Sequence, residues 1–229
     1  MLDRSNNDGL HQDALSGLGY RRLPAEGPPR ARLLLLHGVG GNESNLVGLG
    51  THVDPSVEVI LPRGPLQFGA SQFGWFQVSF GAEGPVIDAA QAERSRQQLI
   101  AFIGALRGQD RDDALPTVIA GFSQGGILSA SVGLSAPQAV KGFGILSGRI
   151  LPELAAQIAA PEALASLTAF IAHGRDDNKL PLYWGERADR WLEELGVPHL
   201  TRIYPMGHEL VAEEVADFIQ WLAEPLALN

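Results

Sequence analysis

The stretch from Thr117 to Gly126 constrains the fold of this chain more than any other. A short apolar run there leads directly into Gly121-Phe122-Ser123-Gln124-Gly125, and a helical pattern follows from Ile127 to Leu134. A G-x-S-x-G pattern between a strand and a helix is typical of a nucleophile elbow, a sharp turn that lifts a serine hydroxyl clear of a sheet. The two flanking glycines suit this turn, because a Cβ atom would collide with the neighbouring strand or helix. The alternative is a serine in an ordinary glycine-rich turn.

Short apolar runs alternate with helical patterns along most of the chain. Several runs are uniformly apolar, which suits strands covered on both faces, as in a parallel sheet. The expected strands cover residues 20–23, 32–37, 57–61, 118–121, 140–146, 168–172 and 200–204, and the expected helices cover residues 42–50, 88–106, 125–134, 151–164, 183–195 and 213–223. This alternation predicts an α/β fold, a mostly parallel central sheet with helices on both faces.

The length favours one domain, because α/β folds of 229 residues are commonly single units. Residues 1–16 are polar and without periodicity, so we expect them to form a flexible N-terminal tail and the domain to span residues 17–229. The glycine-rich, aromatic stretch of residues 63–86 is long for a connection, and connections of that length tend to be functional.

Composition narrows the chemistry and the partners. The net charge of −9 leaves no basic stripe to neutralise phosphates, so no nucleic acid is expected as a partner. The chain has no cysteine, which rules out disulfides, thiol catalysis and thiolate metal sites. The first residues are polar rather than like a signal peptide, and the apolar runs are too short to span a bilayer. We therefore expect a cytoplasmic protein without integral membrane contact.

A serine hydroxyl becomes a good nucleophile only when a base takes its proton and a carboxylate orients that base. In a fold of this kind the chain order is serine, then acid, then histidine, with each partner just after a strand. His208 follows the strand at residues 200–204 and is the predicted base; the other five histidines are less well placed. The acid follows the strand at residues 168–172, where spacing alone leaves Asp176 and Asp177 as alternatives.

An acyl-transfer intermediate also needs two N–H groups directed at its oxyanion. The N–H of Gln124, at the start of a helix, is one predicted donor, and the N–H of Val39 in His37-Gly38-Val39-Gly40-Gly41-Asn42 is the other. A dinucleotide-binding loop is the competing interpretation of these glycines. It fails because Glu43 occupies the position of the third glycine of that motif.

Over roughly residues 30–223 the chain resembles the phospholipase/carboxylesterase family of α/β-hydrolases, the relatives of acyl-protein thioesterases. The motifs that carry the resemblance are spread along the chain. They are Leu36-His37-Gly38-Val39-Gly40-Gly41-Asn42, Gly64-Pro65, Trp75-Phe76, Gly121-Phe122-Ser123-Gln124-Gly125-Gly126, Leu146-Ser147-Gly148, His173-Gly174 with Asp177 and Pro181, and Gly207-His208. One departure is that Phe73-Gly74 precede Trp75, where family members often carry an arginine.

The resemblance implies a catalytic triad of Ser123, Asp177 and His208, because the family's H-G-x-x-D register with its later proline selects Asp177. It implies oxyanion donors at Val39 and Gln124, and hydrolysis of carboxylic esters or thioesters without cofactor or metal. An acyl pocket that includes Trp75 and Phe76 is expected in the aromatic stretch, although these rings could instead merely pack it onto the domain.

The expected partner is a small-molecule acyl ester or thioester, and a homodimer is left open. The alternatives are a lysophospholipase-type lipid hydrolase and a non-catalytic ligand-binding homologue; a peptidase on the same scaffold is less favoured.

Overall fold

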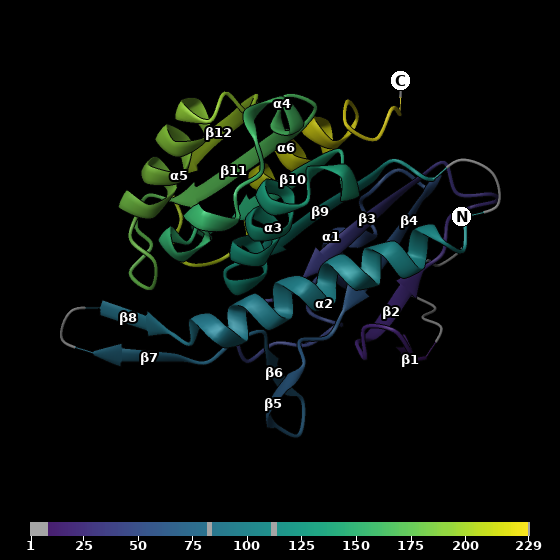
Figure 1. The fold of residues 1–229 in the computed structure, drawn as a ribbon, viewed down its shortest axis with the longest axis horizontal. Helices are drawn as coiled ribbons and strands as arrows, with labels where there is room; N and C mark the ends of the chain where they lie inside the picture. The colour runs from purple at the N-terminus through teal and green to yellow at the C-terminus, as the bar shows by residue number, and fades with distance from the viewer. Residues whose placement is uncertain (1–8, 82–83, 111–113, 229) are drawn as a thin grey trace.

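The computed structural model describes residues 9–81, 84–110 and 114–228. Their main feature is an eight-stranded sheet, in which the two pairings at one edge, β1 with β2 and β2 with β4, are antiparallel and the other pairings are parallel (Figure 1). In spatial order the strands are β1 (His11–Gln12), β2 (Gly19–Leu23), β4 (Val57–Pro62), β3 (Ala31–Leu36), β9 (Thr117–Phe122), β10 (Gly142–Leu146), β11 (Thr168–Gly174) and β12 (His199–Tyr204).

Helices cover both faces of this sheet (Figure 1). One face carries α2 (Ala89–Arg107), α3 (Gln124–Ser135) and α5 (Tyr183–Glu194); the other carries α1 (Val47–Gly50) and α6 (Ala212–Leu222). A short helix α4 (Pro161–Leu164) and two 3₁₀ turns, Pro137–Ala139 and Pro152–Gln157, complete the helical segments among the described residues. The predicted α/β-hydrolase architecture, a mostly parallel sheet between two helical layers, is confirmed.

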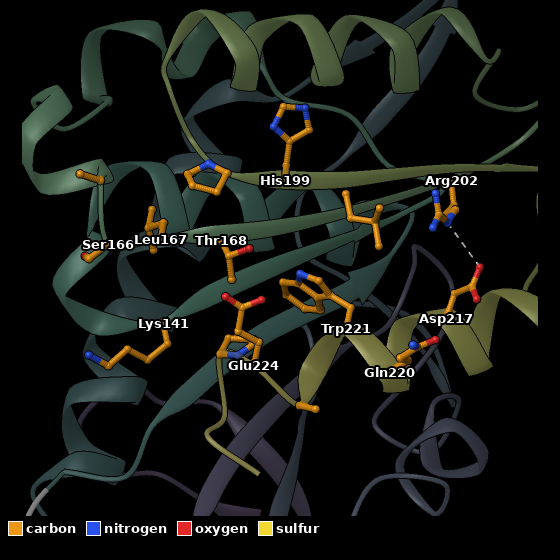
Figure 2. Close-up of a pocket in the computed structure, with 15 residues that line it drawn as sticks. Lys141, Ser166, Leu167, Thr168, His199, Arg202, Asp217, Gln220, Trp221 and Glu224 are labelled. Carbon is orange, nitrogen blue, oxygen red and sulfur yellow. Dashed lines mark ion pairs between the residues drawn. The ribbon is translucent and has the colours of Figure 1, made fainter. Parts of the chain in front are cut away.

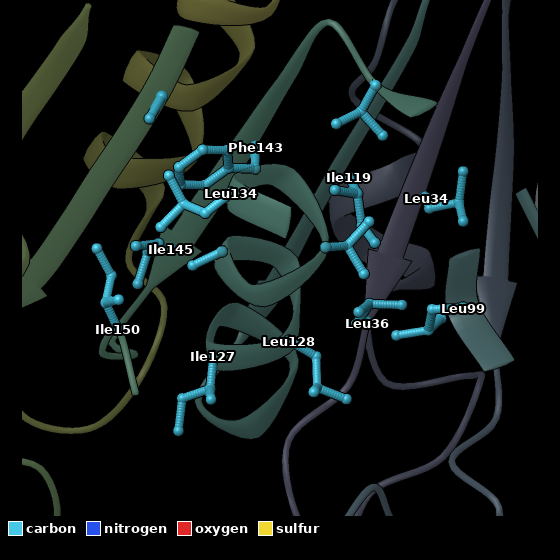
Figure 3. Close-up of a cluster of buried hydrophobic side chains, with 14 of the residues drawn as sticks. Leu34, Leu36, Leu99, Ile119, Ile127, Leu128, Leu134, Phe143, Ile145 and Ile150 are labelled. Atoms are coloured by element: carbon cyan, nitrogen blue, oxygen red, sulfur yellow. The ribbon is translucent and has the colours of Figure 1, made fainter. Parts of the chain in front are cut away.

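The uniformly apolar strands have the physical cause expected of them. Leu34 and Leu36 of β3 belong to a buried cluster with residues of α2, α3 and α5 (Figure 3). Leu33 and Leu35 of the same strand point to the other face and pack with residues of α1 and α6. All six residues of β3 are buried, so alternation of side-chain direction produces no polar face.

Three expected segments differ in the structure. The helix expected over residues 42–50 is only the single turn α1, because the side chains of Asn45 and Asn42 accept the backbone N–H groups of Asn42 and Ser44 and hold the chain in turns before it. The helix expected over residues 151–164 is broken, with Pro161 starting the second piece. Residues 63–86 are not a plain connection. They contain the strand pairs β5 (Leu66–Gly69) with β6 (Gln72–Gly74) and β7 (Val78–Gly81) with β8 (Gly84–Ile87).

The expected N-terminal tail overlaps the sheet. Residues 1–8 lie outside the described residues, and His11–Gln12 pairs with Gly19 and Tyr20 as the edge strand β1. In the part of the chain that the structure describes, no helix is both long enough and apolar enough to cross a membrane.

Glu214, in the first turn of α6, is a carboxyl group buried with few partners. It is 1% exposed, and one oxygen accepts the Val211 N–H at 3.4 Å, while Oε1 has no hydrogen-bond partner in the part of the chain that the structure describes. Burial raises the pKa of Glu214 from 4.5 to about 8, against a small lowering by the Val211 N–H. Below pH 4.5 the group is protonated in both states; as pH rises towards 8 the unfolded chain ionises first, so stability is lost across that window.

We expect Glu214→Gln to remove this pH-dependent loss. Relative to wild type, the variant should gain on the order of 2–4 kcal/mol in unfolding free energy between pH 4.5 and pH 8, measured by urea denaturation. Glu213→Gln, at the exposed neighbouring position, is the control and should shift little. Parallel pH profiles for Glu214→Gln and wild type would contradict the assignment.

Candidate active site

Ser123 lies in the turn between β9 and α3, in a backbone conformation that non-glycine residues rarely adopt. Its φ is 55° and its ψ is −116°. The turn fits only because its neighbours lack side chains. A Cβ at Gly125 would fall on Leu36 O of β3, and one at Gly121 would lie 2.5 Å from the Gly125 carbonyl carbon. The predicted strand–turn–helix setting is therefore present, with the steric reason for both glycines.

The structure brings Ser123, His208 and Asp177 into one hydrogen-bonded series. With its proton on Nδ1, His208 donates to Asp177 Oδ2 at 2.6 Å, which leaves Nε2 to accept from Ser123 Oγ at 3.0 Å. The Phe122 ring lies 4.8 Å from the His208 ring, centroid to centroid. These residues follow β9, β11 and β12, whose carboxyl ends meet at one edge of the sheet.

The two adjacent aspartates face different ways. Asp177 is buried, and its Oδ1 accepts the N–H groups of Lys179 and Leu180 at 2.8 Å each, so both of its oxygens are bound. Asp176 is exposed, and its backbone N–H donates to Met206 O at 3.0 Å, which ties its loop to the one that carries His208. Only Asp177 contacts His208.

His173, at the end of β11, holds the loop that contains Asp177 by a hydrogen bond. It is 0% exposed, its Nε2–H donates to Leu180 O at 2.7 Å, and its Nδ1 has no hydrogen-bond partner among the described residues. Burial lowers its pKa despite the opposing effects of Leu180 and Asp177, so the ring is neutral near pH 7. In the sequence this histidine stood out only as the first residue of the family's H-G-x-x-D pattern, and its part in holding the loop could not be read there.

The loop after β3 carries Val39 beside Ser123. Gly40 has φ +76°, and its N–H donates to Phe73 O at 2.8 Å, while the Gly41 N–H donates to Gly38 O at 3.1 Å. The loop is thus held against the aromatic segment, with Val39 on the wall of the cavity that contains Ser123. Gln124, the first residue of α3, has a backbone N–H in the turn whose donors lack intrahelical acceptors.

A buried series of hydrogen bonds fixes the aromatic segment to the turn that carries Ser123. The Gln124 side chain accepts the Trp75 N–H at 3.0 Å and donates to Phe76 O at 2.7 Å. Trp75 Nε1–H donates to His37 O at 2.9 Å, and His37 Nε2 accepts the Gly64 N–H at 2.9 Å. Burial lowers the pKa of His37, which matches its use as a neutral acceptor.

The two predicted substrate-binding aromatics occupy different positions. Phe76 lines a cavity of about 300 Å³ together with Ser123 and His208. Trp75 is 0% exposed and is not among the residues that line this cavity. The remaining lining residues are mostly apolar; they include Val78, Phe122, Ile87, Ile127 and Leu180.

A larger hollow of about 870 Å³ lies at the opposite edge of the sheet, beside the first residues of β11 and β12 (Figure 2). Its charged side chains come in both signs: Lys141 and Arg202 with Asp217 and Glu224, of which Arg202 and Asp217 form an ion pair at 3.7 Å. None of the predicted site residues lines it. Across the described residues, no group of three or more histidine or acidic side chains is arranged to hold a metal ion.

Glu43, the residue at which the dinucleotide motif fails, forms an ion-pair cluster directly after the Val39 loop. Its carboxylate accepts from Arg63 Nε at 2.6 Å and from Arg21 Nε at 3.2 Å. Burial favours a raised pKa, but the hydrogen bonds from Arg63 and Arg21 outweigh it and lower the pKa of Glu43 to about 2. The Arg63 guanidinium also stacks 4.4 Å from the Phe73 ring centre. The cluster thus joins the segment after β3 to β2, to the residue after β4 and to β6.

The strand–turn–helix serine, the ordered series Ser123–His208–Asp177 and the central sheet together define a chain of the α/β-hydrolase class. A model of the phospholipase/carboxylesterase family matches residues 23–225. The chain therefore belongs to the phospholipase/carboxylesterase family, and it is a hydrolase.

Individual relatives agree with this placement. The chain is 30% identical to acyl-protein thioesterase 1 of Mycosarcoma maydis over 223 residues, with 85% of this chain and 90% of the relative covered. The crystal structure of esterase PE8 superposes with a TM-score of 0.79 at 25% identity, covering 96% of this chain and 100% of the other. A carboxylesterase of Bacillus cereus has the same fold, with a TM-score of 0.78 at 24% identity over 91% of this chain and 94% of its own.

We expect Glu43→Gln to lower the unfolding free energy at pH 7 by about 1–3 kcal/mol, because Arg63 and Arg21 lose a buried counter-charge. The folded-state pKa of Glu43 is depressed, so its contribution is present above pH 4.5 and is lost as pH falls towards 2. The difference in unfolding free energy between the variant and wild type, measured by urea denaturation, should become smaller as pH falls through that window. Arg202→Gln, which removes the more exposed pair with Asp217, is the control and should cost less than about 1 kcal/mol. A gap that does not change with pH would contradict this.

Proposed function

We propose that this hydrolase cleaves carboxylic esters or thioesters of small to medium acyl groups through an acyl-enzyme intermediate. Ser123 is the nucleophile, His208 the general base and acid, and Asp177 the residue that orients His208. The observation that carries the proposal is the unbroken series from Asp177 Oδ2 through His208 to Ser123 Oγ, with separations of 2.6 and 3.0 Å, on the wall of one cavity.

The proposed reaction has two matching halves. Ser123 Oγ attacks the carbonyl carbon and passes its proton to His208 Nε2, while the N–H groups of Val39 and Gln124 hold the oxyanion. Collapse breaks the C–O or C–S bond, and His208 returns the proton to the leaving alcohol or thiol. Water then attacks the acyl-serine with His208 again as base, which releases the acid and restores Ser123.

The size of the cavity supports the acyl range. A volume of about 300 Å³ stands at the lower end of ligand sites, which are typically about 300–1,000 Å³. Phe76 is the proposed contact with substrate. We assign Trp75 a positioning role instead, because its buried ring holds His37 O and its backbone N–H binds Gln124.

A fluorophosphonate probe and a panel of p-nitrophenyl esters, thioesters and lysophospholipids of graded acyl length test this function. Labelling and hydrolysis that both disappear in Ser123→Ala support it. Labelling without turnover of any substrate would favour a non-catalytic ligand-binding homologue, and turnover confined to lysophospholipids would favour a lipid hydrolase. Hydrolysis that persists in Ser123→Ala would overturn the proposal.

The adjacent aspartates provide a matched pair of variants. We expect Asp177→Asn to lower kcat by about 10³- to 10⁴-fold, since the amide can stabilise the wrong His208 tautomer. Asp176→Asn should remain within about threefold of wild type, because the Asp176 side chain is exposed and the hydrogen bond to His208 comes from Asp177. Equal losses from the two variants would refute the role given to Asp177.

The cavity also predicts an effect on acyl length. Val78, half-buried in β7, lines the wall beside Ile87, its partner in β8. We expect Val78→Trp to shift the preferred p-nitrophenyl ester to a shorter acyl chain. Ser79→Trp, on the next residue, whose side chain points to the other face of the strand, should leave the preferred length unchanged. An unaltered length profile in Val78→Trp would place the acyl group elsewhere.

A further inference from the structure

Arg149 follows β10 and lines the same cavity as Ser123 and His208. Its side chain takes no part in the reaction described above. The residue is 6% exposed, so most of its surface is withdrawn from water. A buried charge without a partner is costly, and natural proteins seldom keep one without a use.

The other buried arginines of the described chain are fully partnered. Arg32 is 4% exposed and pairs with Glu58 and Asp110, each at 2.8 Å. Arg96 is 9% exposed and binds Glu93 and Ser135 at 2.6 and 2.7 Å. Within the described ranges, Arg149 has neither a hydrogen bond nor an ion pair to any acceptor.

The contact that Arg149 does make positions it without using its N–H groups. Its guanidinium carbon lies 4.4 Å from the ring centre of Trp184, in the first turn of α5. Stacking on a ring face fixes the plane of a guanidinium and leaves its edge, with five N–H donors, open to an acceptor. Burial lowers the pKa of Arg149, opposed by the charge of the exposed Glu153; the group still stays protonated at neutral pH.

The charge of the cavity wall points the same way. Exposed Lys179, two residues after Asp177, is a second cation on the wall, and no carboxylate is among the described residues that line it. The hollow at the other edge of the sheet differs, because carboxylates are among its lining residues and one of them, Asp217, pairs with Arg202 (Figure 2).

We infer that the substrate carries an anionic group, which the guanidinium edge of Arg149 binds with help from Lys179 while Ser123 attacks the ester or thioester carbonyl. This rests on the proposed function, since it assigns the specificity of the same site. A carboxylate and a tetrahedral phosphonate or sulfonate share the required chemistry, because a guanidinium can bind two oxygens of either. Arg149 is then a specificity residue for the ester cleavage.

The test compares charged with neutral substrates of matched size. On the acyl side these are p-nitrophenyl esters of adipate, of the corresponding ω-phosphonate and of monomethyl adipate. On the alcohol side they are hexanoates of p-hydroxybenzenesulfonate and of its neutral methyl sulfone. Wild type should favour the anionic member of at least one side by about 10- to 100-fold in kcat/KM, the range expected of a charge-assisted hydrogen bond. A preference on the acyl side or on the alcohol side identifies which half of the substrate carries the charge. The anionic group that gives the larger preference identifies its chemical form.

Variants assign the preference to Arg149. Arg149→Gln should reduce the ratio of kcat/KM for the anionic to that for the neutral substrate by at least about tenfold. Arg149→Lys should restore part of this ratio, because lysine keeps the charge but lacks the planar guanidinium that binds two oxygens. Arg187→Gln is the matched control: Arg187 also stacks on Trp184, at 5.5 Å, but does not line the cavity, so its ratio should equal that of wild type. An equal fall in Arg187→Gln would trace the effect to the packing of α5 and overturn the inference.

A measurement on wild type alone covers the case in which Arg149→Gln does not fold. Adipate should inhibit hydrolysis of the neutral ester competitively and at least about tenfold more tightly than adipamide, its neutral isostere. Ser123-dependent hydrolysis with no charge preference on either side, and equal inhibition by the two compounds, would overturn this inference and leave the proposed function intact. Hydrolysis independent of Ser123 would instead overturn the proposed function.

Discussion

The close approach of α3 to β3 and β9 is the constraint on which the site depends. Gly125 lies so near Leu36 O that no side chain fits there. A side chain at Gly121, on the strand side of the turn, would collide with the backbone of Gly125 and with Leu36 O. This approach lets the chain reverse within a few residues and holds Ser123 at φ 55°, with its hydroxyl towards His208. Backbone strain of about 1–3 kcal/mol at such a residue persists only where the surroundings impose it, and here the packed sheet and α3 do so.

Around that turn, histidines and carboxylates that are not in direct contact with Ser123 hold the loops in place. Neutral His37 binds Gly64 beneath the Val39 loop, and neutral His173 binds Leu180 beneath the Asp177 loop. Glu43 joins the Val39 loop to Arg63 and to the start of the aromatic segment. These buried polar groups have defined partners, which is what keeps several irregular loops in one arrangement at the edge of a regular sheet.

Much of this was open to prediction because it depends on local pattern. A strand covered on both faces must be uniformly apolar, so the apolar run that ends at Leu36 predicted a strand of a parallel sheet. A serine on a strand-to-helix turn needs small neighbours, so the glycines around Ser123 predicted that turn. The helix expected over residues 42–50 is a single turn because asparagine side chains compete for backbone groups. The stretch of residues 63–86, for which no strand was predicted, contains two strand pairs whose alternation is too short to recognise in the sequence.

The sequence by itself determined the class of fold, the serine and its turn, and the order in which acid and base follow along the chain. The tertiary structure decided what depends on contacts between distant segments. It brings Asp177, which the family register selected and spacing alone left open, against His208, and it makes Phe76 but not Trp75 part of the cavity wall. It also buries Arg149 without a hydrogen bond or ion pair among the described residues. Periodicity and turn chemistry are local and can be read from neighbouring residues. The direction of a side chain in a loop and the partner it meets are set by packing between elements far apart in the chain.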